Sequence, residues 1–513
     1  MNGQILHENT SFKEFIWGNF KNRRIIKLTS IAILIQLVVF KYFYPYPSFI
    51  HDDSFVYLET AYKNFGINSY LVGYSRFLRL FSVFTSSDTA LVVFQYLLIQ
   101  CSSLFFLFTI FYFHSPSKIV QIILLCFMVL NPLFLFLANL ISSDGFFLAI
   151  SLIWFGLLVW IINKPSRNIL VWHAVILFIA FTVRYNALIY PIITILAFLK
   201  SSMNVRQKIF GLGTAFFCCL MFVTYTTLKY KTISGYWQYA PFSGWQLSNN
   251  AMYAYRYVDS ANRKPVPNEF KRLDESIRKY FDSTRNVLRF PKENLQASTF
   301  YMWDRSLPLY HYRNMVFAKD SISTDFQKWA MMGPLYKSYG LYIIKQYPDY
   351  FARYFLWPNA NKYYAPPVEY LQKYNAGIDS AVPLTAEWFG YYKVHSRVKG
   401  YKTRLLDFYP IISGMMNLVF LASLIAYFLL KGYGFNSRFY KMILLTGTFW
   451  IVNAAFSIFS TASALRFLAF PILLMTISSL TLIDYLCKIA IKTDVNKALK
   501  PDSRRIETGT IQF

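Results

Sequence analysis

The chain has 513 residues, of which 55% are hydrophobic, 20% aromatic and only 15% charged. Soluble globular proteins carry about 25% charged residues, so the composition excludes that class. The net charge of +27 is accompanied by no DNA- or RNA-binding motif, and no nucleic-acid partner is predicted. Much of the positive charge lies in short loops and tails beside apolar runs, where it orients the chain and meets anionic lipid.

Apolar runs of about 20 residues recur along the chain, the length that crosses a bilayer as a helix. They predict an all-α polytopic membrane protein with about ten spanning helices. The fifth and sixth runs are short and are compatible with a tilted or partly inserted hairpin. The predicted spans are 25–45, 89–113, 118–139, 145–163, 169–183, 187–200, 209–228, 409–430, 441–460 and 467–487.

The distribution of Lys and Arg gives this bundle an orientation. With the N-terminus in the cytoplasm, every short inner loop is basic, and the short outer turns hold only Asp144, Arg184 and Arg466. Both termini are therefore predicted to be cytoplasmic, with a tail at 491–513. None of the five cysteines lies in the long loop 229–408, so the sequence gives no sign of a disulfide framework. The lack of disulfides favours a bacterial inner membrane over the endoplasmic reticulum.

Two outer segments are long. Residues 46–88 form an outer loop of an N-terminal module, 1–228, and include Arg76-Phe-Leu-Arg79-Leu-Phe, whose spacing predicts a helix in the membrane interface. Residues 229–408 are rich in Tyr, Lys, Asn and Pro and predict a mainly helical periplasmic domain, followed by C-terminal spans within 409–490. Helical periodicity is clearest at Asn268–Arg289 and Ser323–Phe355.

Acidic residues follow the first span and precede the fourth. His51-Asp52-Asp53-Ser54 places two carboxylates at the membrane edge, where one of them has the chemistry of a general base toward a hydroxyl. Ser142-Ser143-Asp144 lies in a short turn on the same face. The alternative is that an Asp caps the following helix, which at the first cluster would be Ser54–Phe65.

Two arginines complete the outer face: Arg184, in Arg184-Tyr185-Asn186, and Arg466. An arginine at the end of a span often only extends toward water. Its guanidinium is also the side chain best suited to hold a phosphate. Because separate turns bring acids and arginines to one otherwise uncharged face, we expect a shared site for a lipid-linked phosphate.

These elements resemble the GT-C superfamily of membrane glycosyltransferases, in particular the protein O-mannosyltransferase and aminoarabinose-transferase branch (glycosyltransferase families 39 and 83). Their short motifs appear in the family's order over residues 25–230 and, more weakly, 440–475. The matching motifs are Asp53-Ser54-Phe-Val-Tyr57, Leu130-Asn131-Pro132 with Ser142-Ser143-Asp144, Arg184-Tyr185 through Pro191, and Arg466-Phe467 through Pro471.

The resemblance implies a GT-C-like bundle that transfers a sugar from a polyprenyl-phosphate donor to a hydroxyl of a glycan, lipid or protein, with inversion. Asp53 is then the base, with Asp52 as its rival, and Asp144 orients the acceptor or Asp53. Arg184 and Arg466 neutralise the phosphate, helped by Arg76 or Arg79. Tyr57, Tyr185 and Asn186 belong to the same substrate-binding motifs. No metal or other cofactor is predicted, although some relatives use a divalent ion, for which Asp53 and Asp144 would be the ligands.

Other functions fit the topology. A transporter or flippase of lipid-linked glycan is the leading alternative, but such proteins place charged sites near the bilayer midplane, where these spans are nearly uncharged. A polysaccharide polymerase would be expected to concentrate Arg or His in its large outer loops, and a scaffold would not explain the clustering. Six tryptophans of the long loop are candidate platforms for sugar rings or members of an aromatic belt: Trp237, Trp245, Trp303, Trp329, Trp357 and Trp388.

Overall fold

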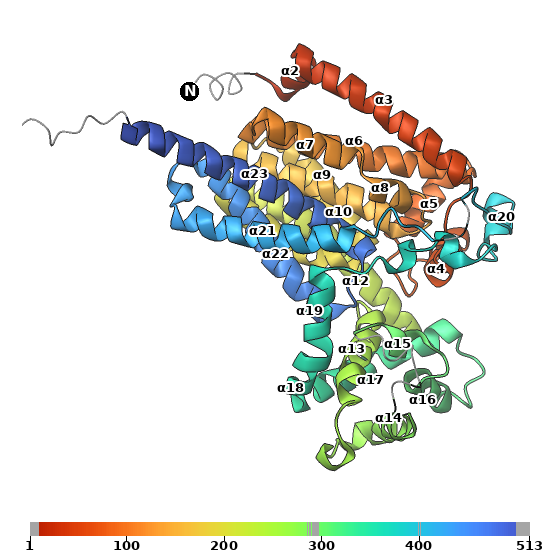
Figure 1. Cartoon of the computed structure of the whole chain (residues 1–513). Helices are drawn as coiled ribbons and strands as arrows, with labels where there is room; N and C mark the ends of the chain where they lie inside the picture. Colours follow the sequence, from red (N-terminus) through yellow and green to blue (C-terminus); the bar gives the residue numbers. More distant parts are fainter. Residues whose placement is uncertain are drawn as a thin grey trace, which may run out of the picture.

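The computed structural model describes residues 10–284, 286, 289, 297–398, 400 and 402–498. Within these ranges the chain is built of helices, and extended pairing is confined to three isolated bridges, one of which joins Ser48 to Leu140. Figure 1 shows a bundle of long helices with a second group of shorter helices at one end.

Eight helices in the described part of the chain are long and apolar enough to cross a membrane, which agrees with the predicted all-α polytopic membrane class. They are α3 (Phe20–Phe43), α6 (Asp88–His114), α7 with α8 (Lys118–Val129 and Pro132–Ala138), α9 (Ser143–Asn163), α12 (Val205–Ser234), α21 (Tyr409–Leu429), α22 (Ser437–Ser460) and α23 (Leu465–Ala498). The other two predicted spans are shorter apolar helices, α10 (Arg167–Val183) and η1 with α11 (Tyr185–Ile189 and Tyr190–Lys200). The total of ten therefore stays a prediction.

The third predicted span is broken at Asn131-Pro132. Proline cannot donate to the helical ladder, so it suits the first turn of a new helix. Asn131 caps that helix by accepting a hydrogen bond from the backbone N of Leu133 at 3.1 Å. Its side chain also accepts a hydrogen bond from the hydroxyl of Tyr409, which ties α8 to the start of α21.

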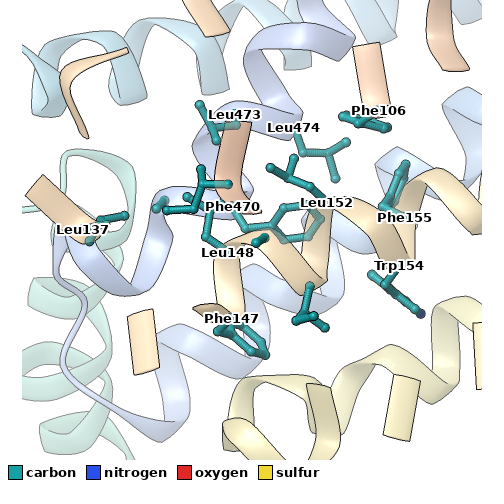
Figure 2. Close-up of a cluster of buried hydrophobic side chains, with 14 of the residues drawn as sticks. Phe106, Leu137, Phe147, Leu148, Leu152, Trp154, Phe155, Phe470, Leu473 and Leu474 are labelled. Atoms are coloured by element: carbon teal, nitrogen blue, oxygen red, sulfur yellow. The ribbon is translucent and has the colours of Figure 1, made fainter. Parts of the chain in front are cut away.

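The centre of the bundle is formed by α9 and α23, the most buried of the long helices at 94% and 78% of their apolar windows. Figure 2 shows their side chains packed with those of α6 and α8, including Leu148, Phe155, Phe470 and Leu473. The rings of Phe155 and Phe470 lie 6.3 Å apart. This core fixes the first turns of both helices, where Asp144 and Arg466 lie.

Residues 46–88 contain two helices, α4 (His51–Tyr62) and α5 (Gly73–Ser82), and the predicted helix around Arg76 is observed as α5. The helix predicted from Ser54 begins three residues earlier. Its N-cap position is Ile50 and has no side-chain cap. Asp53 therefore lies within the first turn and does not cap α4, so the capping alternative is wrong.

The shorter helices below the bundle in Figure 1 have their own buried core, built from residues between 230 and 355. The predicted helix 323–355 appears as α17, α18 and η5, and the one at 268–289 as η3 and α14, with its last residues partly outside the described ranges. This second group of helices consists of α13 (Pro241–Tyr255), η2 (Ser260–Asn262), η3 (Asn268–Phe270), α14 (Lys271–Ser283), α15 (Phe300–Trp303), α16 (Pro308–Val316), α17 (Asp325–Gln346), α18 (Pro348–Phe351) and the π-helical turn η5 (Ala352–Leu356).

The rest of the predicted domain 229–408 joins the core of the long helices instead. Tyr374 and Leu406 pack within that core. The side chain of Asn375 accepts a hydrogen bond from the backbone N of Phe49 at 3.0 Å, which holds the segment leading to α4. The elements of this part are α19 (Trp357–Tyr364), η6 (Glu369–Leu371), η7 (Tyr374–Gly377) and α20 (Thr385–Phe389), and η8 (Gly432–Gly434) follows α21.

The backbones of helices α13 and α17 approach each other closely because glycines, which have no side chain, lie at the contact. A Cβ atom on Gly244 would clash with the carbonyl oxygen of Gly333. Overpacking of this kind costs about 1–3 kcal/mol. We expect Gly244→Ala to lower the melting temperature of the purified protein by several degrees, measured by intrinsic fluorescence during heating.

Gly213 on α12 is the matched control, because a Cβ there meets nothing within 4 Å. Gly213→Ala should leave the melting temperature unchanged or slightly raised, since alanine favours the helix. Equal melting temperatures for the two variants would contradict the close packing of α13 on α17.

Candidate functional site

Four side chains from separate parts of the sequence meet at one end of the bundle. Asp53 and Asp144 lie in the first turns of α4 and α9. Arg184 joins α10 to η1, and Arg466 lies in the first turn of α23. Because α9 and α23 begin at the same end of the core, the carboxylate of Asp144 and the guanidinium of Arg466 come into contact although they are far apart in the sequence.

Arg466 is the centre of this group. Its Nη1 donates hydrogen bonds to Oδ2 of Asp53 at 2.8 Å and to Oδ2 of Asp144 at 3.2 Å. Arg184 pairs with the other oxygen of Asp144 through its own Nη1. The side chains of Arg466 and Asp144 are only 7% and 1% exposed, so each buried charge depends on its partners.

Aromatic rings hold the two guanidinium groups in place. The Cζ atom of Arg466 lies 4.3 Å from the ring centroid of Phe467 and 4.6 Å from that of Tyr370. Arg184 reaches the same Phe467 ring at 4.8 Å. Cation–π contacts of this kind orient a guanidinium while leaving its edges available to an anion.

A tyrosine holds the other side of Asp53. The hydroxyl of Tyr70 donates to Oδ1 of Asp53 at 2.7 Å, and Tyr57 hydrogen-bonds to Ser143, next to Asp144, at 2.8 Å. Burial and the charge of Asp53 raise the pKa of Tyr70 well above its usual value. Burial raises the pKa of Tyr57 to about 12. Both hydroxyls therefore remain protonated at physiological pH.

The loop that leads to Arg466 is fixed by an amide side chain. Nδ2 of Asn359 donates to the backbone carbonyl oxygens of Ile458 at 2.8 Å and Ser457 at 3.3 Å, at the C-terminus of α22. Its Oδ1 accepts a hydrogen bond from the backbone N of Ser463 at 3.0 Å. Asn359 thus connects the end of α22 to the turn that delivers Arg466, although no sequence pattern had marked it.

A cavity of about 1260 Å³, called the site cavity below, opens beside these charges between the long helices and the α13–α17 group. Asp144 does not line it and lies behind the two arginines. The predicted residues that do line it are Asp52, Asp53, Tyr57, Arg184, Tyr185, Asn186 and Arg466.

Arg76 and Arg79 are placed elsewhere, and neither lines the site cavity. Arg76 donates to the carbonyl oxygen of Phe65 at 3.1 Å, and Arg79 to that of Ala61 at 3.0 Å. Basic side chains satisfy free carbonyls at a helix C-terminus in this way. Both arginines therefore join α5 to the end of α4, and the structure gives no support for their predicted contact with a phosphate.

Glu369 lines the site cavity and was not predicted from the sequence. Its backbone has a positive φ of 43°, an uncommon conformation for a residue other than glycine. Burial raises the pKa of its carboxyl, while Lys362 and Arg466 act in the opposite direction. The preceding Pro366-Pro367 indicates a turn, but nothing in the sequence places that turn beside Arg466.

No group of three or more His, Cys, Asp or Glu side chains in the described ranges is arranged to hold a metal ion. The absence of a cofactor accordingly stays a prediction.

Comparison with known proteins assigns no relationship. No protein-family model matches the sequence, and no curated protein and no solved structure shows significant similarity to it.

The Asn359 contacts give a direct test of how the Arg466 turn is held. Asn359→Ala removes the side-chain hydrogen bonds and leaves buried backbone groups without partners. Each buried group left without a partner lowers the free energy of unfolding by about 1–3 kcal/mol. We expect a fall in the melting temperature of several degrees. Asn361→Ala, an exposed position on the same helix, is the control and should leave the melting temperature unchanged; a fall of similar size there would show that the amide contacts of Asn359 are not the cause.

Proposed function

We propose that this protein transfers a sugar from a polyprenyl-phosphate carrier to an acceptor hydroxyl, with Asp53 as the base. One observation supports this function above the others: Arg466 links Asp53 to Asp144 at the wall of a large cavity at one end of apolar helices. A base and two guanidinium groups within one cavity are what a phosphate leaving group and a hydroxyl nucleophile require.

The donor phosphate would bind at Arg184 and Arg466, both of which line the site cavity. The side chain of Arg184 is 15% exposed and that of Arg466 is 7% exposed, and guanidinium groups at a cavity wall suit a phosphate. Leu188 and Phe456 line the adjoining part of the cavity, on η1 and α22. Apolar side chains next to helices of spanning length suit the prenyl chain of such a carrier.

The chemical step is a single displacement. The acceptor oxygen attacks the anomeric carbon as Asp53 takes the hydroxyl proton. The bond between the anomeric carbon and the phosphate oxygen breaks, and its electron pair leaves with the phosphate. Because phosphate leaves readily, cations replace the general acid that an inverting glycosidase needs. The configuration at the anomeric carbon is inverted.

The contacts favour Asp53 over Asp52 as the base. Both carboxylates line the site cavity, but Asp53 is held at both oxygens, by Tyr70 and Arg466. A base held in this way is oriented before the substrate arrives. Asp144, buried behind the arginines, is a positioning residue that holds Arg184 and Arg466 and does not touch the acceptor.

Asp53→Asn tests the base. The amide cannot accept the acceptor proton, so we expect transfer to fall at least about a hundredfold, the lower range for loss of a general base. Binding of the donor should persist. The measurement supplies the purified protein with radiolabelled polyprenyl-phosphate sugars and a cell-envelope extract as the acceptor source, and follows the label that leaves the lipid.

Glu59→Gln is the matched control on α4, because Glu59 pairs with Lys63 away from Asp53. It should retain full transfer. Full transfer by Asp53→Asn would place the base elsewhere. If the wild-type protein in vesicles moved the labelled lipid between leaflets without consuming it, the protein would be a flippase.

Arg466→Lys tests the phosphate contact while retaining the charge. Lysine lacks the planar fork of arginine, so the donor KM should rise by roughly tenfold or more, with the acceptor KM little changed. Arg79→Lys is the control, because Arg79 donates to the carbonyl oxygens of Ala61 and Tyr62 on α4. Equal donor KM values for the two variants would remove Arg466 from the phosphate site.

A further inference from the structure

Three aromatic rings in the wall of the site cavity form a cluster beside the proposed base. The ring of Tyr70, whose hydroxyl bonds Asp53, lies 6.2 Å from the ring of Phe242 and 6.1 Å from that of Trp303. Phe242 and Trp303 are 5.9 Å apart. All three line the cavity and keep part of their surface accessible. We call Tyr70, Phe242 and Trp303 the aromatic wall.

The structure separates Trp303 from most of the other five candidate tryptophans. Trp245 and Trp329 belong to the buried core of the α13–α17 group. Trp388 packs near Tyr62, and Trp357 is 68% exposed and does not line the site cavity. Trp237 lines the cavity but has no ring contact with the aromatic wall among the described residues.

Polar residues of the α13–α17 group line the same cavity as the aromatic wall. They include Ser243, Thr299, Asp304 and Lys337. Asp304 directly follows Trp303, and its Oδ1 accepts hydrogen bonds from the backbone N of Ser306 at 2.9 Å and from the hydroxyl of Ser306 at 2.6 Å. Ring faces beside a few hydroxyl, carboxylate and ammonium groups suit a ligand with apolar C–H faces and a hydroxyl rim.

The two carboxylate oxygens of Asp53 face different groups in the wall of the cavity. Oδ2 faces Arg466, and Oδ1 faces Tyr70 and the aromatic wall behind it. In an inverting displacement, the leaving phosphate and the attacking hydroxyl lie on opposite sides of the anomeric carbon. A phosphate on the arginine side therefore places the acceptor on the tyrosine side.

From this arrangement we infer that the acceptor is a carbohydrate, and that one of its sugar rings packs on Trp303 and Phe242 while its hydroxyl reaches Asp53. This inference rests on the proposed function for the position of the acceptor. The aromatic wall and its polar neighbours identify the class of ligand: a glycan rather than a protein or lipid hydroxyl.

The test measures sugar binding separately from transfer. Saturation-transfer difference NMR on the full chain in detergent uses methyl glycosides of glucose, mannose, galactose and N-acetylglucosamine as probes. We expect at least one to bind the wild-type protein, and Trp303→Ala to weaken that binding about tenfold, as expected when a stacking ring is lost. Trp357→Ala is the matched control and should bind normally.

The outcomes separate this inference from the proposed function. Failure of all four glycosides to bind, or unchanged binding by Trp303→Ala, overturns the carbohydrate subsite, even if donor-dependent transfer is normal. Binding that depends on Trp303, without consumption of any polyprenyl-phosphate sugar, supports the carbohydrate subsite and contradicts the transferase. A melting temperature for Trp303→Ala equal to that of the control shows that the loss is local.

Discussion

The ion pairs of Arg466 are the constraint on which the site depends. A guanidinium that is 7% exposed must be compensated, and two carboxylates from distant helices share its Nη1. Removing one partner of a buried pair costs about 3–5 kcal/mol, whereas replacing the whole pair by apolar side chains is often neutral. The group therefore contributes less to stability than to alignment, because it requires the first turns of α4, α9 and α23 to meet at one point.

Because of that alignment, Asp144 and Asp53 have different surroundings and different roles beside the cavity. Asp144 is fully enclosed and neutralises both arginines from behind, which leaves Asp53 at the cavity wall between a cation and a tyrosine hydroxyl. The proposed transfer needs this separation, because the phosphate and the acceptor must approach the reacting carbon from different sides. The aromatic wall and the apolar part near Leu188 then offer different surfaces to a glycan and to a prenyl chain.

Much of this arrangement could be predicted from local signals. Apolar runs identify the long helices, since span length follows from bilayer thickness. The sparse charges of the predicted short outer turns identify Asp144, Arg184 and Arg466, and the acidic pair after the first span identifies Asp53. Glu369 and Tyr70 could not be found in this way, because their positions depend on how segments 46–88 and 363–398 fold over the end of the bundle. Arg76 and Arg79 have the same residue type and face as the site arginines, and only the packing of α5 on α4 removes them from it. Trp303 could not be distinguished from the other tryptophans, since burial in the second core is a tertiary property.

The most direct measurement is an experimental structure of the purified protein in lipid nanodiscs with a polyprenyl-phosphate sugar bound. We expect phosphate density within about 3 Å of guanidinium nitrogens of Arg184 and Arg466, the distance of a charge-assisted hydrogen bond. The sugar should lie between that phosphate and Asp53, with the prenyl chain leaving past Leu188 and Phe456. Phosphate density at the opposite end of the helices, or a carrier bound outside the site cavity, would contradict the proposed sugar transfer at Asp53.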